Sequence, residues 1–517
     1  MNHKRNVLYL IAVTVILKFL LATFLQLGND EVYYIVYTHH LKLNYFDHPP
    51  FVAFVLKLFS LDLWLKNEAF LRLGFIFCGA VATWLMFLIG AKIYNPRAGW
   101  FAALLYSASV YGNIISGFMI MPDGPMAVFW LSALYFAINA VQIAGKKRNG
   151  YLLLFGLAAG LSIMGKVSSA MLWVGLGGYA LFSDRAMLKN LSFYLAALIT
   201  ILIISPVLWE LVMQQAAGAD YHANRVAIHQ LTSVRLDSFM RQVLGEFGYN
   251  NPIVYVLSLV GLSYCLKKKL LPAKTNQLLL FFALPLIAMV WFFSLFNNTL
   301  PHWTGASFLT LIFFGAVFIA HKTELFANKK LLKWVYAANG IVAALMIFIV
   351  IAVNFLPVGF NAKENLKSGK GDLLLDFSGW KQLGKDFKNI HEQDIAEGLM
   401  KQNSFLLSSY WFPAAHIDWY VAEANKYPFM AVGSLYDIHE YAWLNARRRQ
   451  LKPGDDAYFI SISNYYNRPD SLLFDHFSFV EKTDTIVQKR AGVPVRNFYI
   501  TRLKNYKGGI PENGLIK

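Results

Sequence analysis

Residues 331–356 read LLKWVYAANGIVAALMIFIVIAVNFL, an apolar run whose only charge is Lys333. About 20 such residues in a helix cross the hydrocarbon core of a bilayer. No comparable run follows this one, whereas ten precede it, so the sequence predicts a polytopic α-helical membrane protein with about 11 transmembrane helices. They are expected at about residues 7–27, 69–91, 99–118, 124–144, 151–165, 169–183, 190–210, 252–266, 276–296, 303–320 and 331–356.

The composition of the 517 residues agrees with a membrane protein. Hydrophobic residues make up 57% and charged residues 15% of the chain, against about 25% charged in soluble domains. The mean hydropathy is +0.43. These values exclude a disordered chain, a collagen-like chain and an ordinary soluble enzyme. Two cysteines exclude a disulfide framework and a cysteine-based zinc site.

Charge divides the chain into two expected domains. Residues 1–359 carry 26 Lys and Arg against 12 Asp and Glu, whereas the remainder carries 21 against 18 and has no long apolar run. We therefore expect a transmembrane domain at 1–357 and a soluble α/β domain at 358–517. The soluble domain is expected to form strands at 405–408, 429–432, 458–463 and 497–502, and helices at 379–390 and 414–424.

The placement of the basic residues predicts the orientation. One alternating set of loops holds 17 of the 26 basic residues and only two acids, and such loops face the cytoplasm. Eleven spans then place the soluble domain on the outer face of the cytoplasmic membrane. The other loops hold the remaining ten acids, which are Asp30, Glu31, Asp47, Asp62, Glu68, Asp123, Glu210, Asp220, Asp237 and Glu246.

An active site among these acids faces outward, where cytosolic nucleotides are absent. Chemistry there needs an energy-rich donor carried by the membrane, so we expect no nucleotide cofactor. The placement of the positive charge also argues against a nucleic-acid partner and for contact with membrane lipids.

Asn29-Asp30-Glu31 follows the first span directly. Two adjacent acids at the mouth of an apolar bundle can supply a base or hold a metal. Alternatively, Asp30 caps the next helix, because Asp is a good N-cap and acids suit the first turn.

Two further acidic elements lie on the same expected face. In Tyr45-Phe46-Asp47-His48-Pro49-Pro50 the prolines force an extended entry for His48, and the following residues 51–61 are too short to span, so they predict an interfacial or re-entrant segment. Asp123, at the outer start of the fourth span, is either a helix cap or a second acid of the site.

Two basic side chains complete the candidate set. Lys166 interrupts an apolar stretch, and a Lys near membrane depth tends to face a polar cavity or a partner. It suits a phosphate oxygen, although a snorkelling Lys at a turn is the alternative. His302, in Leu300-Pro301-His302-Trp303, can bind a metal, a phosphate or nothing.

Taken in order, these motifs resemble one family. The elements N-D-E-x-Y-Y, Y-F-D-H-P-P, P-D-G-P, G-L-x-x-G-x-x-x-x-x-K and P-H-W are similar to those of the bacterial branch of the protein O-mannosyltransferase superfamily, classed as glycosyltransferase family 39. Relatives of the lipid A aminoarabinose transferase belong to it, and there the second element is commonly E-K-P-P. The resemblance covers about residues 1–330.

The resemblance implies a GT-C membrane fold in a bacterial inner membrane, with a periplasmic C-terminal domain. It implies transfer of a sugar from a polyprenyl-phosphate donor to a hydroxyl or phosphate of a lipid, glycan or protein acceptor. Asp30 is then the base of a single inverting displacement, with the acids Glu31 and Asp123 as further catalytic residues. Substrate binding is expected from Tyr33, Asp47, His48, Lys166 and His302, and a divalent cation is expected on Asp47 or His302.

Two other functions are compatible with the same residues. A flippase for a lipid-linked sugar also places charges in a membrane cavity, but it should show inverted repeats, which the two halves of the span region lack. An assembly protein that binds through its soluble domain would use Asp30 and Asp47 as caps only.

Overall fold

The computed structural model describes residues 2–213, 234–326, 329–360, 365–465 and 471–516; Asp220 lies outside them. The chain forms two compact units, Met1–Leu20 with Lys42–Met346 and Leu21–Leu41 with Ile347–Lys517. Neither unit is one continuous stretch of sequence. The domain boundary near residue 357 stays a prediction.

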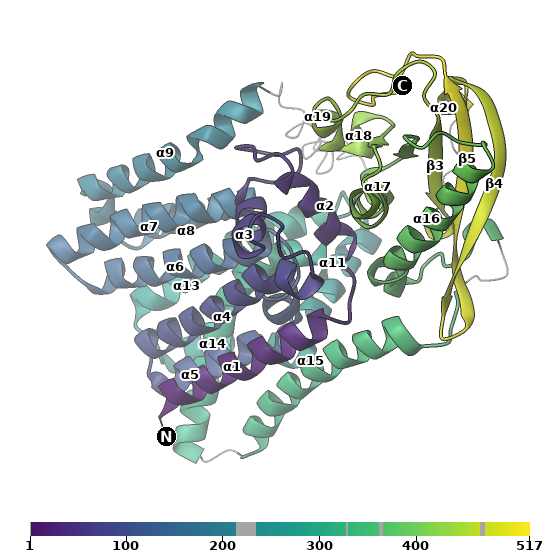
Figure 1. Ribbon diagram of the computed structural model, residues 1–517. Coiled ribbons are helices and arrows are strands. Elements are labelled where there is room, and N and C mark those ends of the chain that lie inside the picture. Colours follow the sequence, from purple (N-terminus) through teal and green to yellow (C-terminus); the bar gives the residue numbers. More distant parts are fainter. Residues whose placement is uncertain (1, 214–233, 327–328, 361–364, 466–470, 517) are drawn as a thin grey trace. The chain divides into compact units, whose positions relative to one another are not determined.

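The first unit is a helical bundle, and every predicted span overlaps a helix (Figure 1). Its main helices are α1 (His3–Ala22), α3 (Phe51–Phe59), α4 (Glu68–Ile93), α5 (Pro96–Ala108), α6 (Asp123–Gln142), α7 (Lys146–Gly165), α8 (Met171–Phe182), α9 (Leu191–Met213), α11 (Leu236–Tyr249), α12 (Pro252–Lys268), α13 (Ala273–Ser294), α14 (Gly305–Phe326) and α15 (Lys329–Phe355). The last residues of α1 and of α15, from Leu21 and Ile347 on, are assigned to the second unit. Short helical turns are η1 (Tyr111–Ile115), η2 (Val167–Ala170), η3 (Arg185–Lys189) and η5 (Pro301–Thr304).

Seven helices of the described residues are long and apolar enough to cross a membrane, namely α1, α4, α6, α9, α13, α14 with η5, and α15. The other four predicted spans coincide with α5, α7, α8 and α12, which do not meet that length and hydropathy. The run predicted at 99–118 is wrong in its outer part, because α5 ends at Ala108, Ser109 is extended, and η1 follows as a separate π-helical turn. The predicted interfacial segment 51–61 forms the nine-residue helix α3.

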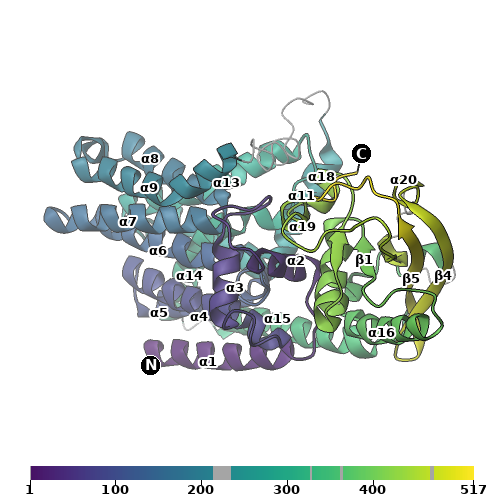
Figure 2. The ribbon, with the colours of Figure 1, turned by 45° about the horizontal axis from the view of Figure 1, so that its top comes forward.

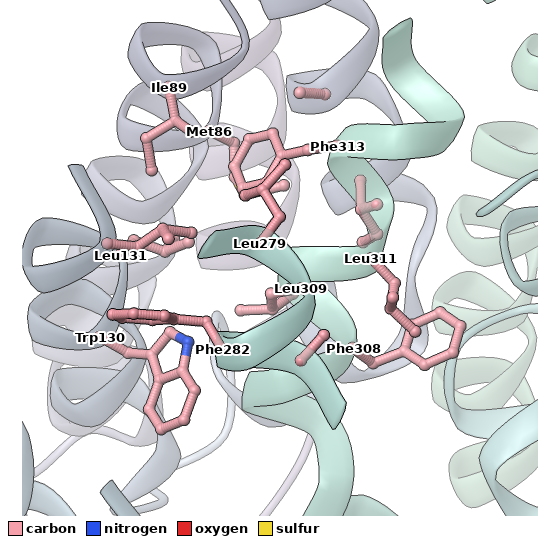
Figure 3. Close-up of a cluster of buried hydrophobic side chains, with 14 of the residues drawn as sticks. Met86, Ile89, Trp130, Leu131, Leu279, Phe282, Phe308, Leu309, Leu311 and Phe313 are labelled. Atoms are coloured by element: carbon pink, nitrogen blue, oxygen red, sulfur yellow. The ribbon is translucent and has the colours of Figure 1, made fainter. Parts of the chain in front are cut away.

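The core of this unit gathers around α14, whose span is 89% buried. A helix that is apolar on all sides is suited to the centre of a bundle. Figure 3 shows Leu309 and Phe313 of α14 beside Phe282 of α13 and Leu131 of α6, all at most 2% exposed. Figures 1 and 2 show α7 running along α6 and α9, against both of which it packs.

The second unit is built on a five-stranded sheet of strand order β2-β1-β3-β5-β4. The strands are β1 (Phe405–Ser408), β2 (Phe429–Ala431), β3 (Ala457–Ile462), β4 (Phe477–Arg490) and β5 (Val493–Tyr506). Strand β1 pairs in parallel with β2 and β3, whereas β5 pairs antiparallel with β3 and β4. The four predicted strands are confirmed, and β4 was not predicted.

Helices complete this unit, and Figure 1 shows α16 running beside the sheet. They are α2 (Asn29–Thr38), α16 (Trp380–Ala396), α17 (Trp411–Ile417), α18 (Leu435–Ile438), α19 (Tyr441–Asn445) and α20 (Ser471–Phe474), with the turns η6 (Asn365–Lys367), η7 (Leu373–Phe377), η8 (Asp418–Glu423) and η9 (Ser463–Tyr465). The helix α2, which carries the N-D-E motif, thus belongs to the unit that contains the C-terminal domain.

Candidate functional site

The predicted site residues divide between the two units. Asp47, His48, Asp123, Lys166 and His302 belong to the first. Asp30, Glu31 and Tyr33 belong to the second.

Asp123 and Lys166 form a buried ion pair in the first unit. The Lys166 Nζ atom lies 3.0 Å from Oδ1 and 2.9 Å from Oδ2 of Asp123. The hydroxyl of Tyr111 donates a third hydrogen bond, of 2.9 Å, to Asp123 Oδ1. The Asp123 side chain is 1% exposed and that of Lys166 12%, so the two predicted residues do meet, away from bulk solvent.

Local backbone geometry brings this pair together. Lys166 is extended (φ −154°, ψ 128°) between the end of α7 and η2. At the preceding residue, a Cβ on Gly165 would lie 2.9 Å from the backbone nitrogen of Met126 in α6, so only glycine permits this close approach of the two helices. The hydroxyl of Ser162 also donates to the Met126 carbonyl, at 3.1 Å. The end of α7 is thereby fixed against the first turns of α6, where Asp123 lies.

His302 lies in η5, close enough to Asp123 for an electrostatic interaction. Its ring centroid is 5.9 Å from that of Tyr249. The neighbouring Thr304 hydroxyl donates a 2.9 Å bond to Oε1 of Glu246, a carboxylate that is 1% exposed. Burial raises the pKa of Glu246, and its hydrogen-bond donors partly oppose that rise. Glu246 is thus a structural residue that anchors the P-H-W element, a role that the sequence did not suggest.

Asp47 and His48 are half-buried in the connection that leads into α3. The backbone N–H of Tyr45 donates to the carbonyl of His48 at 3.1 Å, which closes a turn before the two prolines. Among the described residues, no group of three or more His, Cys, Asp or Glu side chains could hold a metal ion. The cation expected on Asp47 or His302 stays a prediction.

In the second unit, Asp30 and Glu31 have different surroundings. The N-cap of α2 is Gly28, whose N–H donates a 2.8 Å bond to Oε2 of Glu31. Glu31 is fully buried, whereas Asp30 is exposed. The alternative that Asp30 caps the helix is therefore wrong, because the side chain of Glu31 makes the capping hydrogen bond. The catalytic roles expected for Asp30 and Glu31 stay predictions.

Tyr33 is 2% exposed and serves the packing of α2. Its hydroxyl accepts a hydrogen bond from the N–H of Glu440 at 3.1 Å. Its ring centroid lies 5.1 Å from that of Trp411 and 6.0 Å from that of His439. Substrate binding by Tyr33 stays a prediction.

The structure shows polar contacts near the motifs that the sequence did not predict. In the first unit, Lys18 donates a 2.9 Å bond to the carbonyl of Gly117, which lies just before Met121-Pro122-Asp123. In the second unit, the side chain of Asn29 bonds to His416 and Asp376. No local signal in the sequence announces these pairs, because their members are far apart along the chain.

Comparisons with known proteins agree with this architecture. Residues 47–209 match the family model of dolichyl-phosphate-mannose-protein mannosyltransferase. The fold is similar to that of ArnT from Cupriavidus metallidurans in the apo state, with a TM-score of 0.60 at 13% identity over 97% of this chain and 98% of that chain. ArnT bound to undecaprenyl phosphate gives a TM-score of 0.61 at 14% identity over the same shares. No curated protein sequence matches the chain.

Proposed function

We propose that this chain, whose fold is similar to that of ArnT, is a member of the protein O-mannosyltransferase superfamily and an inverting glycosyltransferase that uses a polyprenyl-phosphate-linked sugar. The family match supports sugar transfer. The solved ArnT structure that holds undecaprenyl phosphate supports a lipid-phosphate donor. The acceptor is a hydroxyl or phosphate of a lipid, glycan or protein.

The observation that carries the proposal is the buried Asp123–Lys166 pair. A lysine ammonium has three N–H donors, and the two oxygens of Asp123 engage two of them. The third is suited to an oxygen of the donor phosphate, so Lys166 can meet the leaving group while it stays anchored to Asp123. An anchored cation of this kind favours the transition state, in which negative charge grows on the leaving oxygen.

The displacement itself requires one base and one leaving group. The acceptor hydroxyl attacks C1 of the sugar, its proton passes to the Asp30 carboxylate, and the C1–O bond to the polyprenyl phosphate breaks. The polyprenyl phosphate departs as an anion, and a single displacement inverts the anomeric centre. Asp30 suits the role of base because it is exposed and because Glu31 supplies the helix cap.

We place the reaction on the outer face of the bacterial inner membrane, with the C-terminal domain in the periplasm. The excess of Lys and Arg in the alternating loops supports this orientation. A cation on Asp47 or His302 remains part of the proposal, and no step of the mechanism is derived through it.

Lipids extracted from a strain that lacks the gene provide the test. In that strain the donor should accumulate as a polyprenyl-phosphate-linked sugar, and untargeted mass spectrometry of the lipids identifies that sugar by its mass. The purified protein, added to this lipid together with membranes of the same strain, should consume the donor and release polyprenyl phosphate. Movement of the donor across vesicles without transfer would instead indicate a flippase and contradict the proposal.

A further inference from the structure

The segment around Asp30 is held by many residues of the C-terminal domain within the second unit. The N–H of Leu27 donates to the hydroxyl of Tyr420 at 2.9 Å. The side-chain oxygen of Gln26 accepts from the N–H groups of Trp380 and Lys381, at 2.9 and 3.2 Å. Gln26 thereby caps the start of α16, and the chain is fixed just before α2 begins.

Asn29, the residue directly before Asp30, has both ends of its side-chain amide engaged. Its Oδ1 atom lies 2.9 Å from Nε2 of His416, and the side chain also hydrogen-bonds to the carboxylate of Asp376. Since a carboxylate only accepts, the Asn29 amide nitrogen donates to Asp376 and its Oδ1 accepts from His416. An amide held from both ends has little freedom to rotate.

The two partners of Asn29 are themselves fixed. His416 is fully buried and stacks on Trp380, with ring centroids 3.9 Å apart and planes 4° from parallel. Burial, and then the charge of Arg496, lower the pKa of His416 well below its ordinary value. The imidazole is therefore neutral, and the proton on Nε2 is the one that bonds to Asn29.

Arg496 holds this stack from the other side. Its guanidinium lies 4.2 Å from the centroid of the Trp380 ring and donates to the carbonyl of Ser378 at 2.8 Å. Ser378 follows η7, which carries Asp376, by one residue. One rigid cluster thus fixes both hydrogen-bond partners of Asn29.

The charge of Asp376 also interacts with the charge of Asp30 in the N-D-E motif. Burial raises the pKa of Asp376 to about 6; the hydrogen bond from Asn29 and the charge of Arg496 oppose this rise, and the charge of Asp30 adds to it. Asp30 and Asp376 therefore repel each other across Asn29. Asn29, which is bonded to Asp376 and precedes Asp30 directly, connects the two acids, and a base must be held in one position if it is to meet the acceptor hydroxyl.

We propose that Asn29, clasped by His416 and Asp376, is a positioning residue that sets the location of the Asp30 carboxylate for proton transfer. This inference rests on the proposed function. It gives the C-terminal domain an indirect part in catalysis, since that domain supplies both groups that clasp Asn29. If Asn29 only anchored α2 to its domain, its loss would lower stability and leave the turnover of folded protein unchanged.

Asn29→Asp is the decisive variant, because Asp has the same shape and still accepts from His416 but no longer donates to Asp376. A misplacement of about 1 Å costs about 100-fold in rate, so we expect kcat to fall by about 10- to 100-fold with the donor KM unchanged. The assay uses the purified full-length protein with the lipid-linked sugar extracted from the deletion strain.

The matched control is Asn425→Asp, since Asn425 is another half-buried asparagine of this unit, whose amide donates to the carbonyl of Val421 at 2.9 Å. It should keep wild-type kcat.

A second pair of variants decides the question if Asn29→Asp does not fold. Asp376→Asn retains an oxygen that accepts from Asn29, whereas Asp376→Ala does not, so only Asp376→Ala should lose kcat by about 10-fold or more. Suppose that Asp30→Asn is inactive, as proposed. The positioning role alone would then be overturned by a wild-type kcat in folded Asn29→Asp or in Asp376→Ala. Full activity of Asp30→Asn would instead overturn the proposed base, and the positioning role with it.

Discussion

Replacing Lys166 by methionine removes the cation that faces Asp123 and keeps most of the side chain's length. The Asp123 carboxylate is 1% exposed, and both of its oxygens lie within 3.0 Å of Lys166 Nζ. Removing one partner of a buried ion pair costs about 3–5 kcal/mol, because the remaining charge stays buried without compensation. Lys166 is 12% exposed and Tyr111 still donates to Asp123, so we expect a loss at the lower end, about 3 kcal/mol.

The assay combines stability with turnover. Thermal unfolding of the purified protein in detergent is compared for the wild type, Lys166→Met, Asp123→Asn and the double variant, alongside consumption of the lipid-linked donor. The double variant should be more stable than Lys166→Met, since it no longer buries an unpaired carboxylate. It should not regain turnover, because the cation that meets the leaving phosphate is still missing.

The control for this cycle breaks another half-buried pair of the same unit. The Nη2 atom of Arg148 lies 2.6 Å from Oδ2 of Asp184. Arg148→Met should therefore lower stability, while the folded protein keeps its turnover. The reasoning fails if Lys166→Met turns over like the wild type. It also fails if the double variant is no more stable than Lys166→Met, since Asp123 would then carry no charge that needs Lys166.

Four further predictions concern the base, the acid of the clasp, the metal and the orientation. Asp30→Asn should fold normally and lose at least about two orders of magnitude in transfer rate, whereas Glu31→Gln should lose less; near wild-type transfer by Asp30→Asn would move the base elsewhere. The pKa of Asp376 is about 6 in the folded state and about 4 in the unfolded state, so the folded state binds the proton more tightly. The unfolding temperature should therefore rise as pH falls from about 6 to about 4, and Asp376→Asn should reduce that rise. The same dependence of unfolding temperature on pH in the variant and the wild type would contradict this prediction. Dialysis against EDTA should lower the transfer rate, which added Mg²⁺ or Zn²⁺ restores, and full activity of the chelated protein would exclude the cation. A reporter active only in the cytoplasm, fused after Lys517, should be silent, and an active one would reverse the orientation.

Apolar run length and β-propensity could be read from the sequence because both depend on near neighbours. Every predicted span overlaps a helix, although the outer part of the span at 99–118 does not continue α5, and the strands β1, β2, β3 and β5 lie where apolar residues cluster. The strand β4, FSFVEKTDTIVQKR, was missed because charged and polar residues fill its centre. Its pairing with β5 along most of its length stabilises it, and pairing between strands is not a property of one segment.

The candidate site was predictable as a set of residues, because charged side chains in apolar surroundings stand out in any sequence. The tertiary structure decided what each one touches. Asp123 and Lys166 meet because Gly165 lets α7 approach α6 closely, across 43 residues of sequence. Asn29 is fixed by His416, 387 residues later, and a hydrogen bond over that distance leaves no pattern in the sequence. The sequence by itself therefore determined the membrane helices and the chemical character of the site, whereas only folding decided that Glu31 caps α2 and that the C-terminal domain holds the residue beside Asp30.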